Sequence, residues 1–108
     1  MTSWAYEFSC ERSLYEMAPI LNRSGPWTWG VRDCAFYPDY LQCRPHEGLR
    51  LCVYEVNPPG GPAYRCHVEV GSRSAERRET IEPVLVALLG ELPARGLVEI
   101  EAGEWPFD

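Results

Sequence analysis

The residues of this chain that could perform chemistry are a few cysteines and histidines. Cys43 and His46 are separated by two residues, and Cys66 and His67 are adjacent in a later segment. A structural zinc site uses four nitrogen or sulfur ligands, which often come from two such close pairs. Adjacent residues of a strand point to opposite faces, so Cys66 and His67 cannot easily reach the same ion. Core cysteines with surface histidines are the better interpretation, and we expect no metal and no other cofactor.

A second chemical possibility is a thiol nucleophile. Cys34 lies in a segment without strand or helix periodicity, and His46 or His67 could serve as its base. The neighbouring Asp33 would raise the pKa of this thiol, whereas a reactive cysteine needs a lowered one. The sequence therefore favours a protein without catalytic residues. The alternative is a small-ligand-binding or enzymatic domain with a cleft near residues 33–40.

The charge of the chain narrows the class of partner. Ten basic residues, all of them arginine, stand against 16 acidic residues, and the net charge is −6. Nucleic-acid binding needs a basic surface, so this balance argues against a nucleic-acid partner. It is compatible with a basic protein partner.

One basic segment precedes a predicted helix, where backbone N–H groups and the helix dipole favour an anion. Its arginines are interleaved with glutamates that nearly cancel their charge, so we expect a solvated loop rather than an anion site. The residues are Arg73, Arg77 and Arg78, with Glu76, Glu79 and Glu82.

Length and composition predict one soluble domain spanning residues 1–108. No segment approaches the ~20 apolar residues of a membrane span. The first residues lack the basic and apolar regions of a secretory signal, which predicts a cytoplasmic protein without membrane contact. The five cysteines form an odd set without a CxxC pair and are expected to be reduced thiols. The lack of lysine, with abundant Pro, Gly and Glu, suggests a GC-rich bacterial genome.

Alternating helix and strand patterns would position these residues. Apolar residues of period 2 predict a strand over residues 4–10, and Ser13 with Glu16 forms a capping box that begins a helix. Pro19 should shorten, kink or restart that helix. A second helix is expected from its N-cap Thr80 to Pro93, with an apolar stripe that includes Leu85 and Leu88. Further strands are expected over residues 27–32, 40–44, 49–56, 64–70 and 97–101.

This order predicts an α+β fold, a two-layer sandwich in which two helices cover one face of a largely antiparallel sheet. The order β-α-β-β-β-β-α-β resembles the ferredoxin-like arrangement, of which it would be a variant. That topology hosts many unrelated functions and implies none. In the strand over residues 64–70, Arg65, His67 and Glu69 should face water.

Aromatic residues give the main indication of a binding function. Seven large rings exceed what one face of a small core should hold, so some should line a groove or an interface. They are Trp4, Tyr6, Phe8, Trp27, Trp29, Tyr54 and Tyr64. For Trp27 and Trp29 the sequence does not distinguish core from surface.

The predicted interaction surface is the bend over residues 33–40 together with the C-terminal tail. An apolar centre with an acidic rim suits a basic protein. We therefore expect a non-catalytic interaction domain, immunity- or antitoxin-like, that acts on a basic partner. The competing interpretation is that Phe36 and Tyr40 fold back and close the core. The surface residues are Asp33, Phe36, Tyr37, Asp39, Tyr40, Trp105 and Phe107.

Overall fold

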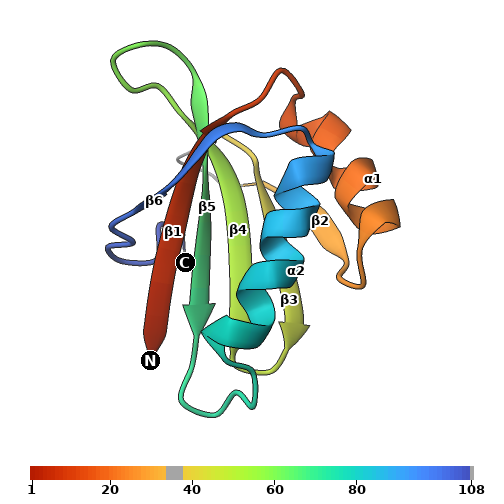
Figure 1. Cartoon of the computed structure of the whole chain (residues 1–108), viewed down its shortest axis with the longest axis vertical. Coiled ribbons are helices and arrows are strands. Elements are labelled where there is room, and N and C mark those ends of the chain that lie inside the picture. Colours follow the sequence, from red (N-terminus) through yellow and green to blue (C-terminus); the bar gives the residue numbers. More distant parts are fainter. Residues whose placement is uncertain (34–37, 108) are drawn as a thin grey trace.

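Six strands and two helices form the computed structural model, which describes residues 1–33 and 38–107 (Figure 1). The predicted element order is confirmed. The elements are β1 (Thr2–Ser9), α1 (Leu14–Ser24), β2 (Trp29–Arg32), β3 (Tyr40–His46), β4 (Leu49–Val56), β5 (Ala63–Val70), α2 (Arg78–Glu91) and β6 (Arg95–Ile100).

The strands form one sheet in the order β2-β3-β4-β5-β1-β6, and every neighbouring pair is antiparallel. The α+β class is therefore confirmed, whereas the ferredoxin-like strand order is not. The reason is the four-stranded meander β2–β5, whose short connections make consecutive strands neighbours. α1 carries the chain from β1 to the far edge of the sheet, and α2 carries it from β5 past β1 to β6.

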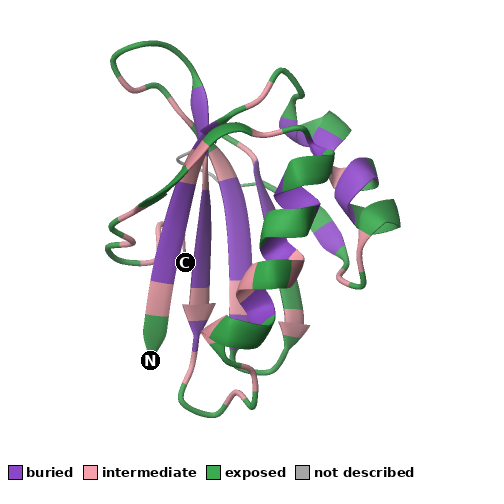
Figure 2. Cartoon of the chain, in the orientation of Figure 1, coloured by how far each residue is buried: buried purple, intermediate pink, exposed green. Residues whose placement is uncertain are grey.

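The hydrophobic core lies between the helices and one face of the sheet. Antiparallel register places Tyr6 opposite Cys66 and Leu51 opposite Val68, so alternate residues of neighbouring strands share this face. Buried residues follow the middle of β1, β4 and β5 and one stripe of α2 (Figure 2). Ile81, Leu85, Leu88 and Leu89 form that stripe, as the sequence predicts.

This helix-covered face holds more aromatic rings than the sequence suggested. Six of the seven rings named above pack in or against the core, because a six-stranded sheet offers a wider face than a small core was assumed to have. Trp4, Tyr6, Phe8, Trp29 and Tyr64 are buried, and Trp27 packs against them partly buried. Tyr54 alone of the seven lies on strand positions of the opposite face.

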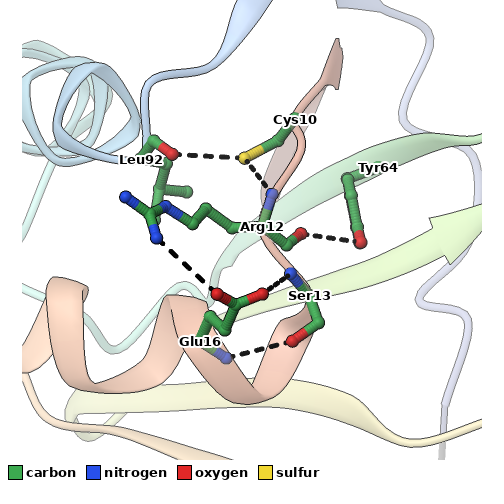
Figure 3. Close-up of polar contacts among 6 residues, drawn as sticks. All are labelled: Cys10, Arg12, Ser13, Glu16, Tyr64 and Leu92. Atoms are coloured by element: carbon green, nitrogen blue, oxygen red, sulfur yellow. Dashed lines mark hydrogen bonds and ion pairs between the residues drawn. The ribbon is translucent and has the colours of Figure 1, made fainter.

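The predicted capping box begins α1. The Glu16 backbone N–H donates to Ser13 Oγ at 3.3 Å, and the Ser13 N–H donates to the Glu16 carboxylate at 3.0 Å (Figure 3). The Tyr64 hydroxyl donates to the carbonyl of Arg12 at 2.9 Å, and Cys10 Sγ donates to that of Leu92 at 3.2 Å. These bonds tie the end of β1 to β5 and to the end of α2.

Several element boundaries differ from the sequence prediction. α1 continues through Pro19 for 11 residues instead of restarting there. The N-cap of α2 is Arg77, three residues before the predicted Thr80, because Thr80 lies in the N3 position and bonds back to Arg77. β2 begins two residues later than predicted, β3 extends to His46 through an irregular pairing, and β6 is displaced toward the N-terminus. The limits of the strands are set by hydrogen bonding between strands, which the local pattern does not encode.

The second face of the sheet, here called the open face, carries neither of the two helices of the described residues. Ala5, Gln42 and Cys52 lie on it, since they alternate with the core residues of their strands. His67 lies there as well but is only 1% exposed, so the expectation that it faces water is wrong. The tail turns back from β6 across this face and covers it (Figure 1). Neither helix in the described part of the chain has the length and apolarity to traverse a bilayer.

Candidate binding site

The C-terminal tail, residues 101–107, brings two aromatic rings onto the open face. Phe107 stacks on Tyr40 of β3, with ring centroids 3.7 Å apart and planes inclined by 5°. It also lies edge-on to Tyr54 of β4, at 5.5 Å. Two segments that the sequence singled out separately, the bend and the tail, therefore meet.

Trp105 anchors the tail closer to the middle of the sheet. Its ring lies 5.3 Å from the His67 ring of β5, inclined by 71°. The guanidinium of Arg50, on β4, lies 4.1 Å from the centre of the Trp105 ring, within the range of a cation–π contact. The tail is thus held at two points by contacts of different chemistry.

A cavity of about 220 Å³ lies beside Phe107. This volume is below the roughly 300–1,000 Å³ of ordinary small-molecule sites, so it suits a single side chain better than a substrate. We call it the tail pocket, and its lining residues are Pro38, Asp39, Tyr54, Glu55, Pro106 and Phe107. Two aromatic rings, two prolines and two acidic residues therefore surround one small space.

A contact from α1 fixes one of these acidic residues. The hydroxyl of Tyr15 donates a hydrogen bond to the Asp39 carboxylate. This bond raises the pKa of Tyr15, so the hydroxyl keeps its proton and Asp39 stays the acceptor. Sequence reasoning did not include Tyr15; the signal for it is a large ring that is 63% exposed on the polar side of α1.

The described residues of the predicted interaction surface differ from one another in exposure. Asp33 is exposed at the end of β2. Tyr40 is 7% exposed and serves the packing of the open face, as the competing interpretation required, although it does so under the tail rather than in the main core. Trp105 and Phe107 are partly buried against the sheet. Phe36 and Tyr37 lie outside the described residues.

Charged groups on the rest of the open face are mostly paired across strands. Three contacts at 2.7–2.9 Å join side chains of neighbouring strands, and two of them pair opposite charges. They are Arg50 with Glu69, Arg65 with Glu7, and Arg32 with Gln42. At the tail pocket, by contrast, the Asp39 carboxylate is partnered by a neutral hydroxyl, that of Tyr15, and not by a cation.

The thiols are poorly suited to nucleophilic chemistry. Cys43, Cys52 and Cys66 are buried and free. Burial raises the pKa of Cys43 and of Cys52 to about 12 and that of Cys66 well above its ordinary value. These groups are thiols, not thiolates, near neutral pH. Cys34, the thiol weighed above as a nucleophile, lies outside the described residues.

The residues considered as zinc ligands are separated in space. Cys43 belongs to the core, whereas His46 is exposed and lies 3.4 Å from Glu76. Cys66 points into the core and His67 to the open face. Within residues 1–33 and 38–107, no three His, Cys, Asp or Glu side chains are grouped as metal ligands.

The arginine segment before α2 is not uniformly solvated. Arg78 bonds to Glu82 at 3.0 Å and to Glu99, and its guanidinium lies 5.0 Å from the centre of the Trp4 ring. Arg73 and Arg77 are exposed, as expected. One of the three arginines is thus committed to holding α2 against β6 and β1.

A larger cavity, of about 450 Å³, lies at the β3–β4 turn. Its basic and acidic residues balance one another, so it has no evident preference for a charged ligand. The lining residues are Arg44, His46, Glu47, Gly48, Leu49, Arg50, Glu69 and Gly71. The tail pocket has the clearer chemical character.

Comparison of the chain with models of protein families, with curated proteins and with solved structures finds no match.

Proposed function

We propose that this protein is a non-catalytic protein-binding domain that receives a basic side chain of its partner in the tail pocket. The observation that carries the proposal is the lining of that pocket, where the Tyr54 and Phe107 rings accompany the acidic Asp39. Aromatic rings and carboxylates both attract a cation, and together they suit a guanidinium or ammonium group.

The overall charge supports a basic partner. At −6 the chain attracts cationic surfaces over a long range, which raises association rates at low salt. An immunity- or antitoxin-like inhibitor in a bacterial cytoplasm would have this charge and this size. The ferredoxin-like relation is retained only as a proposal about topology, and no function is based on it.

The alternative is a small-ligand-binding or enzymatic domain that uses the same cavity near residues 33–40. The described lining offers two carboxyl groups but no thiol, hydroxyl nucleophile paired with a base, or histidine. Catalysis usually needs several titratable groups that converge on one reacting atom. The small volume and this lining favour binding.

The test is a titration of the protein with a capped Gly-Arg-Gly peptide, followed by NMR. We expect chemical-shift changes at Asp39, Tyr54, Glu55 and Phe107, and weaker binding as salt is raised. A matched peptide with citrulline in place of arginine keeps the shape and removes the charge, so it should bind far less.

Variants locate the interaction. Asp39→Asn should weaken binding of the arginine peptide by about two- to fivefold, the range of an exposed ion pair. Glu91→Gln, an exposed carboxylate of α2, serves as the matched control and should change little. Equal binding of the citrulline peptide, or shift changes confined to residues outside the tail pocket, would refute the proposal.

A further inference from the structure

We propose that the tail is a releasable strap, and that protonation of the buried His67 ring detaches Trp105 and dismantles the tail pocket. The inference rests on the proposed function, because it describes how that same pocket is assembled. The tail supplies Pro106 and Phe107 to the pocket lining, so a tail that leaves the sheet removes these two walls.

The geometry at His67 is that of a group enclosed in its neutral form. Its side chain lies between Ala5 of β1 and Cys52 of β4, which are its directly opposite neighbours in the sheet. Trp105 closes the remaining side. Nε2 of His67 is buried and has no hydrogen-bond partner among the described residues, so a proton added there would find no acceptor.

The charges around His67 act in both directions, Glu69 favouring and Arg50 disfavouring a positive charge on the ring, so burial is the main obstacle to protonation. The titratable and charged groups on the packed elements are Arg50 and Cys52 on β4, Glu7 on β1, Arg65 and Glu69 on β5, and Glu104 in the tail. The nearest carboxylates already pair with arginines, Glu69 with Arg50 and Glu7 with Arg65, so they compensate an imidazolium only in part. The Arg50 guanidinium also makes a cation–π contact with the Trp105 ring.

The direction of the pH effect follows from the titration of His67. Burial lowers its pKa, Glu69 acts in the opposite direction, and Arg50 adds to the lowering. A histidine released into water has an ordinary pKa near 6.5, so the docked tail is fully favoured above about pH 6.5. Below that pH the undocked fraction rises by at most about tenfold per pH unit, until the pKa of the docked state is reached.

Segment 101–107 is suited to such a motion because it is short, has no helix or strand, and is joined to the sheet through its rings. Gly103 has a φ of +64°, a conformation that permits the chain to turn back onto the sheet. Beneath the tail, Cys52 is inaccessible, and its thiol would become exposed on release. The reactivity of the Cys52 thiol therefore shows whether the tail is docked on the sheet.

The experiment follows the Trp105 indole N–H signal of the unliganded protein by NMR from about pH 8 to about pH 5, a range that spans the ordinary histidine pKa. We expect the signal to move toward that of an exposed indole as the pH falls. In His67→Gln the signal should stay at its docked position across the range. His46→Gln is the matched control, since His46 is exposed on the β3–β4 turn, and it should behave like the unmodified protein.

A second variant tests the same coupling in the reverse direction, and it avoids any change within the sheet. In Trp105→Ala the His67 ring loses its cover, so its pKa, measured by NMR, should rise toward 6.5, since coupling between two sites is reciprocal. Alkylation of Cys52, located by peptide mass spectrometry at one fixed pH, should accelerate in this variant. An unchanged His67 pKa, or a Trp105 signal that is independent of pH, overturns the inference.

Peptide binding separates this inference from the proposed function. If the tail detaches with His67 but the arginine peptide fails to bind at about pH 8, where the tail is docked, the strap stands and the proposed function is refuted. If the peptide binds in the tail pocket while the Trp105 signal is insensitive to pH, the function stands and the strap is refuted. When both are correct, peptide binding and the docked Trp105 signal decline together as the pH falls.

Discussion

The two faces of the sheet are closed by different means. One face is covered by two helices that together contain 25 residues, and its side chains are almost entirely apolar. The open face is covered in part by a tail whose main contacts come from Trp105 and Phe107, and beneath that tail lie a histidine and a tyrosine. Apolar burial on the first face supplies stability that does not depend on pH, whereas closure of the second depends on a few contacts and on a titratable ring.

This difference indicates where function is expected. A surface that is covered through only a few contacts can open when the pH changes or a partner binds. A helix-covered core cannot open without unfolding. Both the tail pocket and the buried His67 lie on the weakly covered face.

The largest expected effect is on the helix-covered face. Leu88 is 2% exposed, and Leu88→Ala should lower the free energy of unfolding by about 2–5 kcal/mol through lost contacts and a cavity. Denaturant unfolding measures the change. Val86→Ala, on the same helix but 41% exposed, is the control and should cost at most about 0.5 kcal/mol. Equal losses for the two variants would contradict the assignment of the α2 stripe.

A substitution at Gly25 tests how closely α1 and α2 pack on that face. A Cβ at Gly25 would lie 2.5 Å from Leu88 Cδ2, so Gly25→Ala should destabilise the protein by about 1–3 kcal/mol through overpacking. In the double variant with Leu88→Ala the two losses should not add, because the smaller side chain makes room for the new methyl group. Simple additivity in denaturant melts would mean that the α1–α2 contact is looser than described.

Gly90→Ala, with nothing within 4 Å, should stabilise α2.

A smaller loss is expected on the open face. Trp105 is only partly buried, so Trp105→Ala should lower the free energy of unfolding by about 1 kcal/mol, roughly half the value of a fully buried large side chain. Thermal and denaturant unfolding measure it. A loss as large as that of Leu88→Ala would show that both faces are closed equally firmly and would remove the contrast between them.

The smallest effect concerns the charge pairs. Arg65→Met removes the 2.9 Å contact with Glu7, yet it should change the free energy of unfolding by less than about 1 kcal/mol, because the pair is partly exposed. The change should shrink further in high salt. A salt-independent loss well above this range would mean that the pairs, rather than the tail, hold the open face together.

The sequence by itself determined the order of the local elements and, for β1 and β5, the face of the strand that enters the core. Strand β4 has the predicted limits, and the capping box of Ser13 and Glu16 begins α1 as expected. These features depend on residues two, three or four positions apart, whose spacing the backbone geometry converts directly into a shared face or a hydrogen bond.

Tertiary structure alone decided what covers the second face. The alternation of side chains along β5 places His67 on the face opposite the core, and the sequence therefore predicted that it is exposed. His67 is buried instead, because residues 101–107 return across that face. The contact of Phe107 with Tyr40 likewise joins segments far apart in the chain, so no local pattern contains it. The aromatic residues of the bend and the tail could be named as candidates, but the pocket between them exists because the strand order β3-β4-β5 brings their partners side by side.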